Sequence, residues 1–518
     1  MTDPQLGMLE RAAAAGDEQA RVALAQALLS RGAIGSECHE RGLAMLLAAS
    51  TGPRALEVQW LLGAYHLMVT ARAGALEQAR HWLGLAAAAG VAPAIDRLAD
   101  LDLRGLDAGA ALLKHLLLAD RGFYRSAWFV GYLLGHCPAA WDADGPEGAA
   151  GRPGTAASAF ARGCALGFPE AYFSLGVRLA TGDGVEADGD LAKALLLRAA
   201  DGRFPMCREA IETLLPGHAG TEAARWHARL KQNLDAAQPM LERLRPPDGP
   251  TPDAVNPLVP ALEAHLASVG HPAFRIDRAG RLQVGAERQV RVADTRPPQP
   301  QWQALCQSPR VAQARDFASL EECAHLVHRF GPMLTQPRNY ASTGSSNDEA
   351  ELRQFSGVGA PVRVLDADPV VRTLERRLAT MAQWPVEAME PCSIIRYQAG
   401  QAYEPHVDYF TPEQVEANRR ERGDPSGQRV ATFLLYLVVP ASGGVTHYHL
   451  PGISVAGEPG LGLIHYNTTP DGAVDPDSLH SGSAIVAGEK WLWRSTLRER
   501  AIVEAGPGPG PAAPAPVV

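Results

Sequence analysis

The first 242 residues carry apolar positions at helical spacing and are rich in alanine and leucine, which favours helices. Short alanine-rich phrases that contain a glycine recur along this stretch. A glycine tolerates positive φ, so each one can end a helix and let the chain reverse. The period predicts an all-α solenoid of helical hairpins. The glycines lie 32 to 45 residues apart, at Gly16, Gly52, Gly90, Gly122, Gly167 and Gly202.

The pattern changes after residue 242. Residues 243–307 begin with a Pro/Gly/Asp-rich linker. Further on, polar and apolar positions alternate on both sides of Ala279 and Gly280, which predicts a small hairpin. Residues 308–503 show two helical patterns followed by short strands between glycine-rich turns, which predicts a jelly roll, or double-stranded β-helix, with flanking helices. Residues 504–518 are rich in Pro, Gly and Ala, and we expect a disordered tail.

Composition narrows the function classes. The net charge of −9 gives no general attraction to nucleic acid or to an anionic membrane. The N-terminus lacks the positive charge and apolar core of a signal peptide, and no stretch reaches the ~20 apolar residues of a transmembrane helix. The seven scattered cysteines form no CxxC pair, which fits reduced thiols. We therefore expect a cytoplasmic chain with no nucleic-acid or membrane partner.

The strand "YEPHVDYF" places His406 and Asp408 two residues apart, so both side chains can point to one face. A second histidine, His480, begins another strand 72 residues later. Two histidines and one carboxylate form the facial triad of non-haem Fe(II) oxygenases, which leaves coordination positions open for a dicarboxylate cosubstrate and O₂. His447, His449 and His465 compete with His480 for the third ligand position, but only His480 precedes a lysine at a suitable distance.

That lysine is Lys490, in a chain with four lysines among 48 basic residues. At a surface position this composition would favour arginine. A cation inside a barrel could pair with the far carboxylate of a dicarboxylate cosubstrate, so the order of residues assigns this role to Lys490.

Two resemblances follow from these motifs. Residues 169–202, "PEAYFSLGVRLATGDGVEADGDLAKALLLRAADG", resemble a Sel1-like repeat, a relative of the tetratricopeptide repeat. Such repeats usually present a concave surface to a protein partner, and the alternative is a spacer or folding scaffold. Residues 308–499, with "CSIIRYQAGQAYEPHVDYF", "GGVTHY" and "DSLHSGSAIVAGEKW", resemble the prolyl 4-hydroxylase branch of the 2-oxoglutarate/Fe(II) dioxygenases.

The second resemblance implies that His406, Asp408 and His480 bind iron and form the catalytic centre, and that Lys490 pairs with the C5 carboxylate of 2-oxoglutarate. It also implies roles in the cosubstrate pocket for three further residues, and contact with the substrate for a fourth. For the tyrosines the alternative is packing in the barrel core, and for the arginine an ordinary surface charge. These residues are Tyr397, Tyr436 and Thr432 for the cosubstrate and Arg353 for the substrate.

The resemblance implies hydroxylation of a C–H bond, with Fe(II) as the cofactor, 2-oxoglutarate and O₂ as the consumed cosubstrates, and ascorbate as a reductant. The expected substrate is a prolyl residue of a peptide or protein recruited by the repeats. Two alternatives stay open: a hydroxylase of a free amino acid or other small molecule, and a non-enzymatic adaptor with a degenerate barrel. Departures from the family pattern, such as Val445 in "GGVT", Ala484 and Thr496, lie near the site without touching the triad. The sequence leaves the oligomeric state open.

Overall fold

A computed structural model describes most of the chain. The chain divides into two compact units, which meet in sequence between Phe123 and Tyr124. The residues described are 4–31, 36–69, 74–105, 107–121, 123–136, 156–165, 167–231, 274–276, 281–284, 288–291, 300–335, 356–422 and 424–502.

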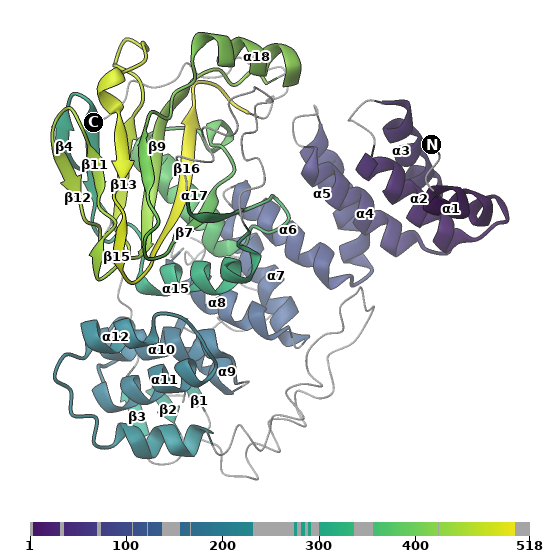
Figure 1. Ribbon diagram of the computed structural model, residues 1–518. Helices are drawn as coiled ribbons and strands as arrows, with labels where there is room; N and C mark the ends of the chain where they lie inside the picture. The colour runs from purple at the N-terminus through teal and green to yellow at the C-terminus, as the bar shows by residue number, and fades with distance from the viewer. Residues whose placement is uncertain are drawn as a thin grey trace. The chain divides into compact units, whose positions relative to one another are not determined.

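The first unit consists of antiparallel helices that pack in consecutive pairs (Figure 1). Its glycines end helices as the sequence predicts: Gly16 and Gly90 both have positive φ. At Gly63 a side chain would clash with Leu83 on a neighbouring helix, so the close approach of these helices requires glycine. The helices are α1 (Pro4–Ala14), α2 (Glu18–Arg31), α3 (Glu37–Ala49), α4 (Ala55–Met68), α5 (Ala75–Ala88), α6 (Ala92–Arg104) and α7 (Ala108–Asp120).

The second unit begins with further helices of the same kind. In the repeat with the strongest resemblance, Gly182 ends one helix in the left-handed conformation, and the side chain of Asp188 caps the next by accepting from the backbone N–H of Leu191. The helices are α8 (Tyr124–His136), α9 (Ala156–Ala165), α10 (Pro169–Thr181), α11 (Gly189–Asp201) and α12 (Cys207–Leu214).

The rest of this unit contains a seven-stranded antiparallel sheet, coloured teal to yellow in Figure 1. Strand β9 runs through its middle and is buried from Ala431 to Leu437, because both faces of the sheet are covered. The strand order is β4 (Gln303–Gln307), β5 (Arg310–Ala314), β13 (Gly462–Tyr466), β9 (Arg429–Val438), β16 (Lys490–Arg498), β7 (Ser393–Tyr397) and β6 (Val358–Pro361).

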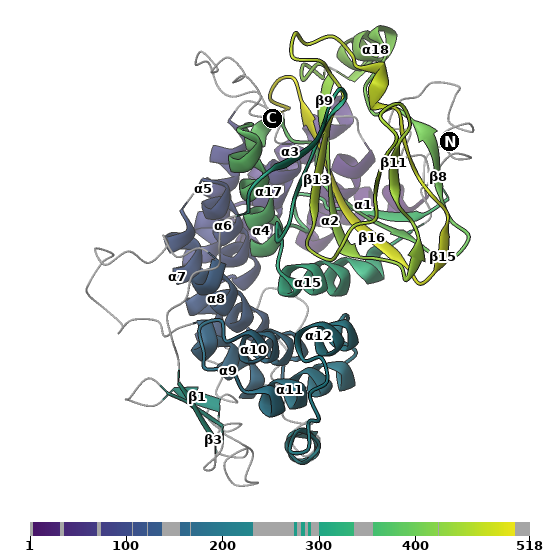
Figure 2. The same ribbon diagram turned by 90° about the vertical axis from the view of Figure 1, so that its left-hand side faces the viewer.

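A smaller sheet faces the large one, and together they form the jelly roll that the sequence predicts (Figure 2). The space between them holds an apolar core that includes Leu434, Tyr448, Leu463 and Leu492. The smaller sheet has the order β12 (Ile453–Val455), β11 (Thr446–Tyr448), β14 (His480–Gly482) and β8 (Tyr403–His406), and a two-stranded ribbon joins β10 (Ser442–Gly443) to β15 (Ile485–Ala487).

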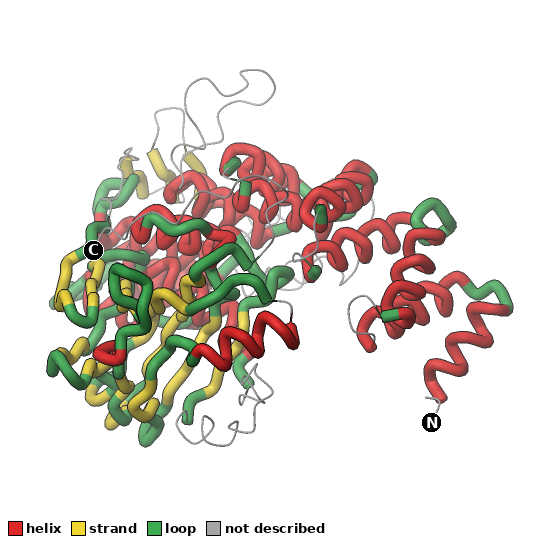
Figure 3. Tube along the Cα trace, turned by 90° about the horizontal axis from the view of Figure 1, so that it is seen from above, coloured by secondary structure: helices red, strands yellow, loops and turns green. Residues whose placement is uncertain are grey.

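Helices cover the other face of the large sheet. Helix α15 packs against β9, and its Cys323 thiol donates to the backbone carbonyl of Tyr436. In Figure 3 most of the strands, drawn in yellow, lie together. These helices are α15 (Leu320–Phe330) and α17 (Pro369–Ala382), close to the predicted 320–330 and 368–384, with α18 (Pro412–Arg422) after β8 and short 3₁₀ turns at Gly331–Met333, Val386–Ala388 and Pro476–Ser478.

A buried ionic network joins the repeat helices of this unit to α15 and α17, the helices that cover the jelly roll, which is called the barrel below. His325 on α15 lies 3.3 Å from Glu170 on α10 and 2.7 Å from Asp368, which caps α17. Its imidazole ring also stacks on Trp128 of α8, with ring centroids 4.6 Å apart. Beside it, the Tyr132 hydroxyl donates to Glu322, which caps α15. These contacts fix α8 and α10 against the helices of the jelly roll.

The structure places the boundaries differently from the sequence. The helices from Tyr124 onward belong to the same compact unit as the barrel, and β4 joins the large sheet before the expected start at residue 308. Local pattern cannot reveal such long-range packing. The strands of the expected hairpin, β1 (Phe274–Ile276) and β2 (Arg281–Val284), pair antiparallel. A third strand, β3 (Arg288–Arg291), pairs antiparallel with β2. The tail at 504–518 lies outside the described residues. None of the described helices is long and apolar enough to cross a membrane.

Candidate metal and cosubstrate site

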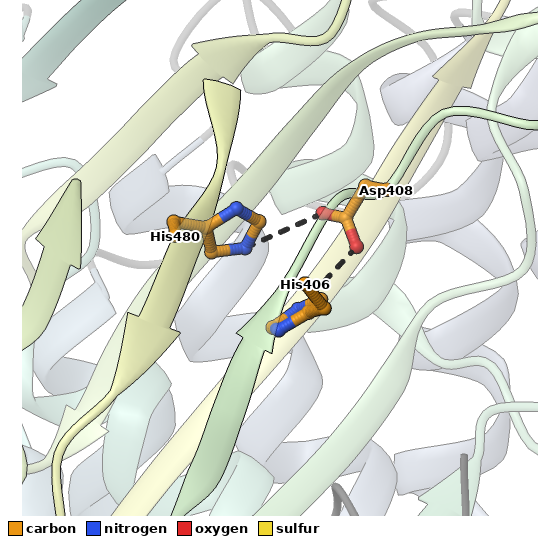
Figure 4. A group of neighbouring side chains, drawn as sticks. All are labelled: His406, Asp408 and His480. Atoms are coloured by element: carbon orange, nitrogen blue, oxygen red, sulfur yellow. Dashed lines mark ion pairs between the residues drawn. The ribbon is translucent and has the colours of Figure 1, made fainter. Parts of the chain in front are cut away.

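The structure brings the predicted triad together between two neighbouring strands. β14 pairs antiparallel with β8 so that His480 lies opposite His406, and Asp408 follows β8 directly. The Nε2 atoms of both imidazoles lie 3.7 Å from carboxylate oxygens of Asp408 (Figure 4). One potential ligand atom from each residue lies within 4.8 Å of the other two, and this is the one such cluster of potential metal ligands in the described part of the chain.

Hydrogen bonds orient both imidazoles. The Nδ1 atom of His406 lies 2.8 Å from the carbonyl oxygen of Glu404, and that of His480 lies 3.0 Å from the carbonyl oxygen of Ser478. A carbonyl can only accept, so each Nδ1 carries the proton and each Nε2 is left with a lone pair aimed at the centre of the cluster. This is how proteins usually fix metal-binding histidines.

Burial also sets the charges that a metal ion needs. Desolvation lowers the pKa of His406, and it lowers the pKa of His480 well below its usual value, so both rings are neutral. Burial alone would raise the pKa of Asp408, but a hydrogen bond from His465 and the nearby imidazoles hold it well below its usual range. Two neutral imidazoles and one carboxylate are a donor set that fits Fe(II).

His465, which competed for the third ligand position, lies behind the triad. Its Nε2 lies 3.3 Å from the Oδ2 atom of Asp408, and its Nδ1 lies 2.9 Å from the hydroxyl of Tyr448. His465 thus supports Asp408. His447 and His449 bond instead to Ser454 and Ser481, outside the cluster.

Lys490 is buried at the start of β16, with 3% of its surface exposed. Its ammonium group donates to the carbonyl of Gly444 at 2.7 Å and to the hydroxyl of Thr446 at 3.2 Å, and it lies 5.1 Å from the centre of the Tyr436 ring. Burial lowers its pKa to about 7. No carboxylate among the described residues forms an ion pair with it, so an anionic ligand here would supply the missing counter-charge.

A single pocket of ≈ 530 Å³, measured with its open mouth, contains both the triad and Lys490. Tyr397 lines it, as the resemblance implies. Tyr436 is not part of the lining, but its hydroxyl bonds to that of Thr446 and its ring supports Lys490. Thr432 also lies outside the lining, and its hydroxyl accepts a hydrogen bond from Asn467.

Sequence reasoning missed several residues of the pocket. Thr446 contacts Lys490, and Tyr403 stacks on His406 with ring centroids 3.6 Å apart. Arg494 lines the pocket two positions beyond Leu492 on β16, and strand alternation from Lys490 could have found it. Arg353, the expected substrate residue, lies outside the described residues.

Comparison with curated proteins finds relatives of this chain. Prolyl 4-hydroxylase 1 of Arabidopsis thaliana is 31% identical over 230 residues, which cover 41% of this chain and 75% of that protein. This chain belongs to the prolyl 4-hydroxylase family. Prolyl 4-hydroxylase 5 of the same plant is 31% identical over 202 residues, which cover 35% of this chain and 66% of that protein. The family and the enzyme class expected from the sequence are therefore confirmed.

Solved structures resemble both parts of the chain only weakly. A viral collagen prolyl hydroxylase from Paramecium bursaria Chlorella virus-1, in complex with 2-oxoglutarate, has a TM-score of 0.28 and 17% identity, and covers 38% of this chain and 98% of its own. A Sel1 repeat protein from Oxalobacter formigenes has a TM-score of 0.32 and 19% identity, and covers 52% of this chain and 78% of its own. No family model matches the chain. The family assignment therefore depends on the sequence relatives.

Proposed function

We propose that this prolyl 4-hydroxylase family member is an Fe(II)- and 2-oxoglutarate-dependent dioxygenase that hydroxylates a prolyl residue of a peptide or protein. The observation that carries the proposal is one pocket that is lined both by the triad and by the buried cation Lys490. A dicarboxylate that chelates a metal through one end and reaches a buried cation with the other fits that arrangement.

His406, Asp408 and His480 would hold the Fe(II) ion through two Nε2 atoms and one carboxylate oxygen. Lys490, positioned by Gly444 and Thr446, would bind the distal carboxylate of 2-oxoglutarate. Bound iron, 2-oxoglutarate and O₂ supply the oxidising power for hydroxylation, with release of succinate and CO₂. Ascorbate would serve as the reductant that returns oxidised iron to Fe(II).

The protein supplies orientation and a dry environment. Tyr397, Leu434 and Ile485 line the pocket with buried side chains, which limits access of water to the bound cosubstrate. The carbonyls of Glu404 and Ser478 keep the two imidazoles in one orientation. The site is therefore complete in its metal ligands and in its cosubstrate cation, which argues against an adaptor with a degenerate barrel.

The helical repeats would recruit the protein substrate. Helices α8–α12 belong to the same compact unit as the barrel, so a partner bound to them stays near the pocket. We also propose that the enzyme acts in the cytoplasm, because the six cysteines in the described part of the chain are free thiols.

The test measures succinate formed from 2-oxoglutarate with Fe(II), with and without proline-containing peptides. His480→Ala and Lys490→Ala should each abolish most of the peptide-stimulated turnover of the wild type. His447→Ala is the matched control for the histidine, because His447 lies on the neighbouring strand β11 and bonds only to Ser454. Lys231→Ala is the control for the lysine, because Lys231 is exposed.

The outcomes separate the candidate functions. If peptides stimulate turnover and hydroxyproline appears in them by mass spectrometry, the proposal stands. If free amino acids stimulate turnover and peptides do not, the chemistry is kept but the substrate is a small molecule. If the wild type binds no iron and forms no succinate, even without substrate, the dioxygenase proposal is wrong.

A further inference from the structure

A second cation, Arg494, lines the pocket, and none of the roles described so far uses it. Side chains alternate along β16, so Lys490, Leu492 and Arg494 share one face, and all three line the pocket. Arg494 is half-buried. Its guanidinium forms no hydrogen bond or ion pair with any described side chain.

The carboxylates in its neighbourhood are already committed. Glu390 lies between Arg429 and Arg498 and accepts hydrogen bonds from both at 2.9 to 3.2 Å. Asp408 faces the imidazoles of the triad and accepts from His465. Arg494 therefore presents a planar, permanently charged donor group to the pocket, without a carboxylate of its own.

The position of Arg494 separates its role from that of Lys490. Four residues on a strand span about 13 Å, so the two side chains start well apart along the pocket. Arg494 lines the pocket together with His406, Asp408 and His480. A cosubstrate carboxylate held at Lys490 would be bound four residues away along β16.

When the metal ion and 2-oxoglutarate are bound, the charge of Arg494 is the one that no other group in the pocket balances. The double positive charge of Fe(II) and the single charge of Lys490 balance the Asp408 carboxylate and the two carboxylates of 2-oxoglutarate. The pocket with cosubstrate bound is then neutral apart from Arg494. A half-buried cation is stabilised by an anion, and an arginine can hold a carboxylate through two parallel hydrogen bonds.

We propose that Arg494 binds a carboxylate of the primary substrate, next to the C–H bond that is hydroxylated. This inference rests on the proposed function and narrows its substrate class. The carboxylate can come from two sources. One is an acidic side chain beside the target proline in a peptide, and the other is the free α-carboxylate of a C-terminal proline or of free proline.

The experiment compares substrates that differ only in this charge. The first pair is a blocked peptide with Glu after the proline and the same peptide with Gln. The second pair is a peptide that ends in proline with a free carboxylate and its C-terminal amide, with free proline and prolinamide as a third pair. Each pair is tested for kcat/KM by hydroxyproline formation, and for equilibrium binding by calorimetry with Mn(II) in place of Fe(II).

The wild type should prefer the charged member of at least one pair by about tenfold, which corresponds to ~1.4 kcal/mol. The pair that shows the preference identifies the source. In Arg494→Gln the preference should fall to near one, and Arg494→Lys should keep part of it. Arg396→Gln is the matched control, because Arg396 lies on the neighbouring strand β7 against the ring of Trp491 and does not line the pocket.

Three results would overturn the inference. The wild type could use charged and neutral substrates equally, or the preference could survive in Arg494→Gln. The third is that Arg494→Gln raises only the KM for 2-oxoglutarate. The last would make Arg494 a cosubstrate contact. Failure of the proposed function gives a different result, namely no succinate formation by the wild type. The inference on Arg494 is tested separately, because peptide binding is measured without turnover.

Discussion

The Nε2 atom of His465 lies 3.3 Å from the Oδ2 atom of Asp408, and the two residues are 57 positions apart in sequence. Because the Nδ1 atom of His465 faces the Tyr448 hydroxyl at 2.9 Å, the Tyr448 hydroxyl can donate to Nδ1 while Nε2–H donates to the carboxylate. The imidazole thereby holds Asp408 in one rotamer, with its other oxygen toward His406. His465 is a positioning residue for the triad.

His465→Phe should weaken metal binding by about tenfold or more, because removal of a partner behind a metal ligand typically costs that much affinity. The measurement is Mn(II) or Co(II) affinity by calorimetry, together with the visible spectrum of the Co(II) form. His465→Gln, which keeps a donor, should recover part of the affinity. Unchanged affinity and spectrum in His465→Phe would show that Asp408 needs no such support.

Binding of 2-oxoglutarate should depend on pH through Lys490. Burial lowers the pKa of this lysine to about 7, so the ligand-free protein loses the ammonium charge as pH rises above 7. The dicarboxylate binds the charged form, so its KM should rise by about tenfold per pH unit above 7, and binding there should take up a proton. Lys490→Arg should flatten this profile, since guanidinium stays charged. A wild-type profile that is flat from pH 7 to 9 would contradict the prediction.

The network around His325 should make unfolding depend on pH. Burial alone would lower the pKa of this imidazole, but Asp368 and Glu170 raise it to about 9. The folded pKa exceeds the usual value of 6.5, so this stabilisation is fully present below pH 6.5 and is lost as pH rises through 9. The free energy of unfolding, measured by urea denaturation, should fall across that window.

His325→Gln should remove this dependence and destabilise the unit by about 3–5 kcal/mol, because it leaves two buried carboxylates without their cation. The pKa of Asp368 is lowered to about 2 and that of Glu170 is also lowered, so their own contributions are lost at acidic pH. His328→Gln, at a partly exposed neighbour 4.0 Å from Glu170, should destabilise much less, because Glu170 keeps its contact with His325. Equal denaturation curves for the wild type and His325→Gln would refute the role of the network.

The repeat helices nearest the barrel should be required for its stability. A chain that begins at residue 300 lacks Trp128, Tyr132 and Glu170, and so exposes the buried face of α15. We expect it to aggregate or to unfold at a lower temperature than a chain that begins at residue 124, which keeps α8–α12. Thermal unfolding and gel filtration of the two chains provide the comparison, and equal stability would contradict it.

The sequence by itself determined the order of the elements and picked out the residues that are proposed to bind the metal ion and the cosubstrate. His406 and Asp408 are two positions apart, a spacing that on a strand predicts one face. In the structure the strand ends at His406, and Asp408 lies two residues beyond it with its carboxylate 3.7 Å from the His406 ring. Lys490 stood out because lysine is rare in this chain. The helices of the repeats and the two helices before the barrel follow from local spacing and capping residues such as Asp188 and Ser319.

Only the tertiary structure decided which side chains support or complete that site. His465 and Asp408 meet because β13 lies in the large sheet and the end of β8 in the smaller one, and no local pattern encodes the packing of two sheets. Thr432 and Tyr436 share a strand face with Leu434, yet only Leu434 lines the pocket. Local spacing gives His325 no partner, and only the packing of α10 and the cap of α17 places a carboxylate on each side of it. Spacing along the chain fixes the direction of a side chain, whereas its neighbours depend on contacts between distant segments.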